Sequence, residues 1–165
     1  MAMKTFLITV TIFVLSVLAL AAAKPDFTGT WKMDRARSYG LPPDMTQVLT
    51  IAQKGDQIEL ETKLIQPNNE RTIKDSITLD GKEYDFTPSV PPNQPTAKGK
   101  RTALWLPGDR GIQVTDVTTA ETPKGPVKTQ TVRKWTISNA GELIVDMYVD
   151  NPNVSYEARR IFIKQ

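Results

Sequence analysis

Phe27-Thr28-Gly29-Thr30-Trp31-Lys32 is the stretch that decides the fold of this chain. Aromatic and β-branched side chains fit the pleated surface of a sheet, so the stretch predicts a strand over 27–33. Glycine inside a strand permits a bend or the close approach of another chain segment, which we expect of Gly29. Trp31 is expected to close one end of a core, where its indole would bury on the order of 200 Å².

Turn residues divide the rest of the chain into further strands. Between Gln57 and Ile65, apolar residues and threonine alternate with glutamate and lysine, as in a strand with one solvent-exposed face. Lys54-Gly55-Asp56 and Asp80-Gly81 are typical of tight hairpin turns, and Asp-Gly is the stronger signal. The predicted strands span 27–33, 48–53, 57–65, 70–79, 83–87, 98–106, 111–119, 127–138, 142–150 and 154–164.

The order of these strands favours one closed sheet. About ten strands in series, joined by short turns, imply antiparallel pairing of neighbours. An open meander would expose two edge strands, and closing it into a barrel removes both. We therefore predict an all-β fold, a single up-and-down antiparallel barrel of about eight to ten strands. A β-sandwich is the alternative, and the proline-rich segment Pro88–Thr96 is expected to be irregular.

Residues Met1–Ala23 have the pattern of an export signal. Lys4 lies near the start, an apolar run extends from Phe6 to Leu20, and the exit is Ala21-Ala22-Ala23. We expect cleavage after Ala23, which leaves a single domain of about 140 residues over 24–165 and no stable membrane insertion. The alternative is an uncleaved anchor, because the run is close to the lower limit of about 17 residues for a membrane span.

The composition excludes several classes of function. The chain has no cysteine, which fits export to a bacterial periplasm or exterior, since exported eukaryotic domains often carry disulfides. It also has no histidine, which excludes Ser-His-Asp and Cys-His catalysis and histidine-containing zinc sites. Basic and acidic residues are interleaved, which argues against nucleic-acid binding. We predict no enzyme, cofactor or metal site, and the oligomeric state stays open.

Both ends of the chain resemble a known superfamily. Phe27–Lys32 resembles the opening strand of lipocalins and fatty-acid-binding proteins, where an aromatic residue precedes Gly-x-Trp and a basic residue follows. Ala158–Lys164 resembles the terminal strand of fatty-acid-binding proteins, which carries an Arg-x-Tyr pair. The whole pattern is similar to lipocalin-like exported proteins of environmental bacteria. Phe162 stands where the family has tyrosine, and residues 34–46 offer no counterpart to the family's two-helix lid.

The resemblance also implies roles for single residues. In lipocalins, a basic residue near the chain end packs over the tryptophan of the first strand. The resemblance therefore implies that Arg159 or Arg160 makes a cation–π contact with Trp31, and that Gly29, Trp31 and Arg159 are structural. Arg160 also matches the arginine that meets the ligand carboxylate in fatty-acid-binding proteins.

The more apolar phase of each strand predicts the inner face of the barrel. This phase carries charged residues inward, namely Arg101, Arg133, Arg160, Asp75 and Asp116. Charges inside a protein need a partner or water. In one interpretation, a wet cavity of a few hundred Å³ receives an amphipathic anion. In the other, the two aspartates neutralise two arginines, the third reaches solvent, and the core is filled. The predicted ligand-binding residues are Arg133, Arg160, Tyr156, Phe162, Trp105 and Trp135.

We therefore predict an exported barrel that binds a small apolar or amphipathic ligand, anionic in the first interpretation. The alternative function is a filled-core envelope or protein-interaction module that uses exposed strands and Pro88–Thr96 as its contact surface. A histidine-free enzyme based on tyrosine or aspartate is a third hypothesis. Nothing in the spacing of Asp75 and Asp116 places them together as an acid–base pair.

Overall fold

The computed structural model describes residues 23–89 and 97–165. All of the predicted export signal Met1–Ala23 except Ala23, and residues 90–96 of the predicted irregular segment, lie outside this range. No helix in the described parts is long and apolar enough to cross a membrane. The elements are β1 (Gly29–Met33), β2 (Thr46–Lys54), β3 (Gln57–Gln66), β4 (Asn69–Thr78), β5 (Glu83–Phe86), β6 (Ala97–Trp105), the 3-10 turn η1 (Pro107–Asp109), β7 (Ile112–Thr122), β8 (Gly125–Ile137), β9 (Leu143–Asn151) and β10 (Val154–Lys164).

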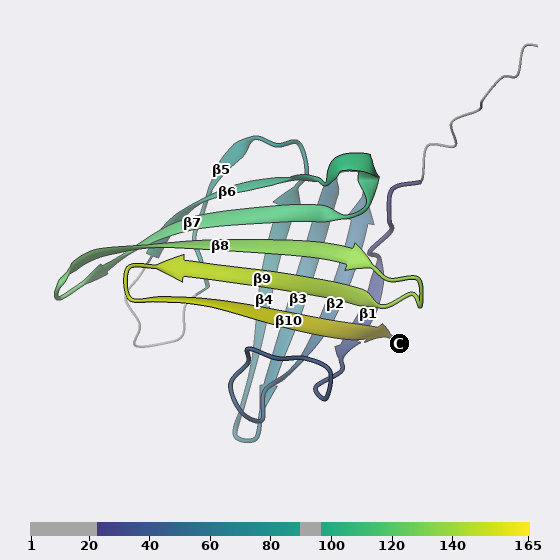
Figure 1. Cartoon of the computed structure of the whole chain (residues 1–165), viewed down its shortest axis with the longest axis horizontal. Coiled ribbons are helices and arrows are strands. Elements are labelled where there is room, and N and C mark those ends of the chain that lie inside the picture. The colour runs from purple at the N-terminus through teal and green to yellow at the C-terminus, as the bar shows by residue number, and fades with distance from the viewer. Residues whose placement is uncertain (1–22, 90–96) are drawn as a thin grey trace, which may run out of the picture.

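These strands form one antiparallel sheet with the order β4-β3-β2-β1-β10-β9-β8-β7-β6-β5. The first and last strands are neighbours, with Trp31 opposite Lys164. The sheet curls on itself, so that β6–β10 form one layer and β1–β4 cross behind it (Figure 1). The predicted all-β up-and-down fold is confirmed, and one curled sheet forms instead of a sandwich.

The closure of the barrel is incomplete. β4 and β5 are the two ends of the sheet and do not pair, which leaves an opening that we call the seam. The predicted removal of both edges is therefore wrong, and so is the Asp80-Gly81 hairpin. The turn forms, but the amide of Gly81 donates to the carbonyl of Ala103, 2.9 Å away, which draws the chain toward β6. The following strand β5 pairs with β6 alone.

The core at one end of the half-barrel is aromatic. We call Phe27, Trp31, Trp105 and Trp135 the aromatic floor. The ring of Phe27 stacks on Trp105 at 6.5 Å and meets Trp135 edge-on at 5.9 Å. The indole Nε1 of Trp31 donates to the carbonyl of Phe27, 2.8 Å away, and Trp31 is 2% exposed. The floor therefore buries large rings while giving Trp31 a hydrogen-bond partner.

The basic residue over Trp31 is Lys164, and the expectation of Arg159 or Arg160 is wrong. Lys164 Nζ lies 5.2 Å from the centroid of the Trp31 ring, because the two residues are opposite each other in the ladder. Arg159 instead points outward to Asp146. The Lys164 side chain crosses Gly29, where a Cβ would lie 2.6 Å from Lys164 Cε. A larger residue at this position would displace the lysine.

Candidate functional site

A charged layer lies directly above the aromatic floor, on the same inward faces of the strands. We call Asp75, Arg101, Asp116, Arg133 and Arg160 the polar layer. Alternation along each strand puts these residues inside. Asp116 follows the buried Val114 by two residues, and Arg160 precedes the buried Phe162 by two. The pattern that buries the floor therefore also carries charge into the half-barrel.

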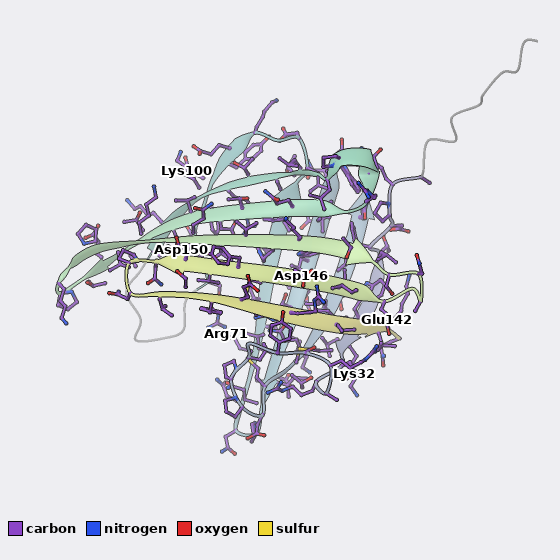
Figure 2. The ribbon with its side chains drawn as sticks, viewed as in Figure 1. Lys32, Arg71, Lys100, Glu142, Asp146 and Asp150 are labelled. Atoms are coloured by element: carbon purple, nitrogen blue, oxygen red, sulfur yellow. The ribbon has the colours of Figure 1, made fainter. Side chains whose placement is uncertain are left out.

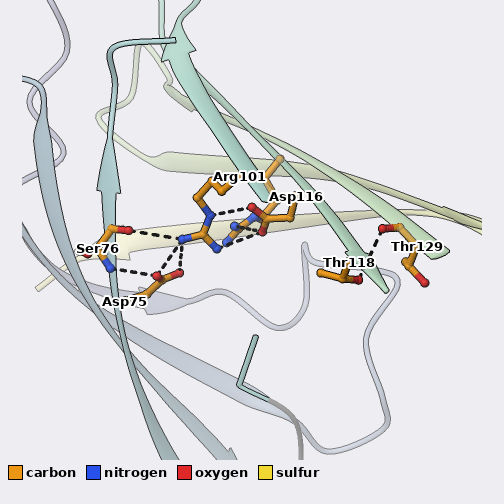
Figure 3. Close-up of polar contacts among 7 residues, drawn as sticks. Asp75, Ser76, Arg101, Asp116, Thr118 and Thr129 are labelled. Carbon is orange, nitrogen blue, oxygen red and sulfur yellow. Dashed lines mark hydrogen bonds and ion pairs between the residues drawn. The ribbon is translucent and has the colours of Figure 1, made fainter. Parts of the chain in front are cut away.

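Arg101 is the best-satisfied member of the layer (Figure 3). Its Nε and Nη2 donate to the two carboxylate oxygens of Asp116 at 2.6 and 3.1 Å, and its Nη1 donates to Asp75 at 2.7 Å. The guanidinium also lies 4.3 Å from the centroid of the Phe86 ring. Burial lowers the pKa of Arg101, but the hydrogen bonds and charges of Asp116 and Asp75 outweigh it and raise the pKa above its usual value.

Arg101 also connects the two sides of the seam. It extends from β6, whereas Asp75 lies on β4. A second contact across the seam starts from β4. Nη2 of Arg71 on β4 donates to the carbonyl of Ser89 at 3.0 Å. Side chains thus bridge the seam, from β6 to β4 and from β4 to the segment after β5.

The other two arginines of the layer are less well satisfied. Nη2 of Arg133 donates to Asp116, but its Nε is buried without a hydrogen-bond partner. Arg160 has no carboxylate partner among the described residues, and its Nε is also buried and unpartnered. Burial, followed by the positive charge of Arg133, lowers the pKa of Arg160. Positive charge is therefore in excess on this side of the layer.

A cavity of about 50 Å³ lies beside Arg133 and Arg160. Three residues of its wall each keep one buried N–H group without an acceptor, namely Arg133 Nε, Arg160 Nε and Trp135 Nε1. An unsatisfied buried donor costs about 1–3 kcal/mol. The volume suits a water molecule or two, or one small anionic group. Its walls are completed by Gln47, Leu49, Leu60, Thr62, Val145 and Phe162.

Four of the predicted ligand-binding residues meet at this cavity: Arg133, Arg160, Trp135 and Phe162. Trp105 does not line it, and its Nε1 instead donates to Asp56 at 2.8 Å. Tyr156 does not line it either, and is 43% exposed in the first part of β10. The cavity that these residues line, at about 50 Å³, is much smaller than the predicted void of a few hundred Å³.

The two aspartates behave partly as the filled-core interpretation predicted. Asp116 binds both Arg101 and Arg133, and Asp75 binds Arg101. The third arginine, Arg160, is half-buried and lines the cavity wall. No group of three or more metal-ligating side chains occurs in the described part of the chain.

Sequence reasoning missed one inward arginine, Arg71. It shares the inward phase of β4 with Asp75 and Ile77, and its Nε is buried without a partner. The signal was present, because Arg71 follows the same alternation as Ile73 and Ile77. The inner face therefore carries four arginines and two aspartates.

Comparisons with known proteins support the fold. No protein-family model matches this sequence, and no curated protein sequence matches it. The structure is similar to that of a solved protein described as the REP1-NXSQ fatty acid transporter, with a TM-score of 0.53 and 16% identity, over 84% of this chain and 95% of that one. The resemblance expected from the two chain ends is thus confirmed as a likeness of fold.

Two further solved structures have lower TM-scores. One is secretory abundant heat soluble protein 4 from Ramazzottius varieornatus, with a TM-score of 0.48 and 13% identity over 84% of this chain and 94% of that one. The other is the fatty-acid-binding protein of Manduca sexta, with a TM-score of 0.42 and 12% identity over 85% of this chain and 100% of that one.

Proposed function

We propose that this chain is a binding protein for a small amphipathic anion, whose charged group occupies the cavity between Arg133 and Arg160. The observation that carries the proposal is the excess of donors at this cavity. Three buried N–H groups of its wall residues have no acceptor, and Arg160 has no carboxylate partner in the described structure. A carboxylate supplies acceptors and compensates the charge in one step.

The size of the cavity limits what it can enclose. About 50 Å³ accepts a head group but no hydrocarbon chain. In the proposal, the apolar part of the ligand extends from the cavity toward the wide end of the half-barrel, along the inner faces of β3 and β4. Leu64 and Ile73 are only partly buried there and offer apolar surface. The likeness of fold to a protein described as a fatty acid transporter supports this choice.

The proposal includes export and no enzymatic activity. The pattern of Met1–Ala23 supports export, as do the absent cysteines. Expression of the full chain in a bacterium, followed by mass spectrometry of the periplasmic fraction, tests it. A mature protein that begins at Lys24 agrees with the proposal, and a full-length chain held in the membrane contradicts it.

Binding is tested by isothermal titration with decanoate and decanol, which share an alkyl chain and differ in the head group. Arg160→Met removes the unpartnered guanidinium and keeps an apolar side chain of similar length. Charge-assisted hydrogen bonds are worth on the order of 1.5–3 kcal/mol, so decanoate should lose about tenfold or more in affinity. Decanol should be nearly unaffected. Arg110→Met, at an exposed arginine after η1, is the matched control.

Two results contradict the proposal. Equal losses for acid and alcohol would mean that Arg160 supports packing, and the absence of decanoate binding to the unmodified protein would exclude this class of ligand. The second result favours the alternative function, a filled-core interaction module. The observation in favour of that alternative is the small volume enclosed above the floor.

A further inference from the structure

A larger hollow lies on the opposite face of the sheet, outside the half-barrel. It measures about 440 Å³, within the usual range of roughly 300–1,000 Å³ for small-molecule sites. We call it the outer groove. It lies over β8, β9 and β10, in the layer where Figure 2 labels Asp146. The side chains that give it chemical character are Tyr39, Lys134, Asp146, Tyr148, Glu157 and Arg159.

Strand register arranges these side chains in rows. Lys134 lies opposite Asp146, and Asp146 lies opposite Arg159. Tyr39 continues this row beyond β10, because it forms an isolated bridge with Arg159. Tyr148 lies opposite Glu157 in the adjacent row. All the strand members have the outward phase, so the groove shares no side chain with the cavity inside.

The wall that carries Tyr39 is fixed in place. Its amide donates to the carbonyl of Arg159 at 2.9 Å, and the amide of Arg159 donates back at 3.2 Å. Gly40 follows at φ +72°, and a Cβ there would lie 2.5 Å from Cβ of Ala158. Only glycine lets the chain approach this closely. Segment 34–40 is thus attached along β10, and Tyr39 stands at the rim of a built groove.

The charges of the groove are balanced. Lys134 and Arg159 are basic, and Asp146 and Glu157 are acidic. Arg159 Nε and Nη2 donate to the Asp146 carboxylate at 2.6 and 3.0 Å, which holds both groups in place. Lys134 and Glu157 have no ion-pair partner within the described residues. An anion would be attracted by two groups and repelled by two, and the same holds for a cation. The groove therefore selects for a neutral ligand that both donates and accepts hydrogen bonds.

Two exposed aromatic rings complete the groove. Tyr39 is 52% exposed and Tyr148 is 44% exposed, and a tyrosine ring offers an apolar face with a polar edge. A sugar ring matches this set of groups, because it has an apolar C–H face and a rim of hydroxyl groups. We propose that the outer groove binds a neutral saccharide, which stacks on Tyr148 and Tyr39. Its hydroxyl groups bond to Asp146, Glu157 and Arg159.

The test uses isothermal titration of the mature protein with maltotriose, cellotriose and tri-N-acetylchitotriose, and with trigalacturonate as an anionic comparison. At least one neutral trisaccharide should bind, and trigalacturonate should bind more weakly. Tyr148→Ala should weaken binding about tenfold, because it removes one stacking face. Tyr148→Phe keeps the ring and should retain most of the affinity. Tyr84→Ala is the matched control, since Tyr84 is 43% exposed but lies on β5.

Three results would overturn the proposal. The first is that none of the neutral trisaccharides binds, which would leave this face to a protein partner. The second is that trigalacturonate binds more tightly than any of them. The third is unchanged binding by a Tyr148→Ala protein whose thermal unfolding midpoint matches that of the unmodified chain, because the folded variant would then lack only the stacking ring.

Discussion

The aromatic floor and the polar layer share strands β6 and β8, where Arg101 and Arg133 lie a few residues from Trp105 and Trp135, and they meet opposite physical demands. In the floor, Trp31 and Trp105 are packed against other side chains and each indole N–H has an acceptor, whereas Trp135, the floor residue that lines the cavity, has none. In the polar layer, Arg160 has no carboxylate partner among the described residues and keeps a buried Nε–H without an acceptor. The same alternation of inward and outward side chains therefore does two things. It packs the core in the floor, and in the polar layer it buries N–H groups that have no acceptor.

The three arginines of the layer also differ from one another in how many carboxylate partners they have. Arg101 has two carboxylate partners, Arg133 has one, and Arg160 has none in the described structure. The number of carboxylate partners per arginine therefore decreases from the seam toward the cavity. At the seam, the ion pairs of Arg101 connect two strands. At the cavity, Arg160 can still donate to a hydrogen-bond partner from outside the chain.

Trp31→Ala should have the largest effect, because it removes the centre of the floor. Trp31 is 2% exposed and contributes both packing and a hydrogen bond to the carbonyl of Phe27. Replacing a buried large aromatic residue by alanine typically costs about 3–5 kcal/mol in the free energy of unfolding. Urea denaturation measures the loss. An unshifted midpoint would show that the floor does not carry the stability of the fold.

Asp116→Asn should have the next largest effect, because it removes the charge that two arginines share. Breaking a buried ion pair by removing one partner costs about 3 kcal/mol or more. Asp146→Asn is the matched control, since it breaks the same Arg–Asp geometry on the outer face, where both side chains are more than 40% exposed. An exposed pair contributes at most about 1 kcal/mol. Equal losses in the free energy of unfolding of the two variants would mean that the polar layer is as exposed to solvent as the outer surface.

Asp56→Asn should have a smaller effect that depends on pH. The hydrogen bond from Trp105, followed by that from Lys24, lowers the pKa of the Asp56 carboxyl below 3.8. A lowered pKa stabilises the folded chain above pH 3.8, and this contribution is lost as the pH falls through the folded value. The difference in thermal midpoint between the two proteins should therefore be constant near neutral pH and shrink below pH 3.8. A difference that grows with acid would contradict the assignment.

Much of the floor could be predicted from the sequence. Alternating side chains and turn residues predict the ten strands, because each strand has one buried face and is flanked by turn residues. Trp31 could be assigned to the core for the same reason. The partner of Trp31 could not, because the choice among Arg159, Arg160 and Lys164 depends on register across the ladder between β1 and β10. A shift of one residue reverses the face of every side chain.

The site was only partly predictable. Strand phase predicts that Arg133 and Arg160 face the interior, the family resemblance adds to this for Arg160, and the same phase argument applies to Arg71. The cavity volume depends on how tightly the two layers curl together, which a strand pattern does not encode. Tyr156 has the inward phase but lies in the first part of β10, before the strand reaches its pairing with β1, and remains exposed. Phase predicts which face a residue takes, whereas burial also requires a facing strand.

The proposed anion site requires that the polar layer leave Arg160 without a carboxylate partner, at a cost to the stability of the folded state. Urea denaturation of Arg160→Met without ligand tests this most directly. Because Arg160 is half-buried and keeps its Nε buried without a partner, the variant should be more stable than the unmodified protein by about 1 kcal/mol. Saturating decanoate should stabilise the unmodified protein more than the variant. If Arg160→Met instead lowers the free energy of unfolding and decanoate stabilises both proteins equally, Arg160 is a packing residue and the account is wrong.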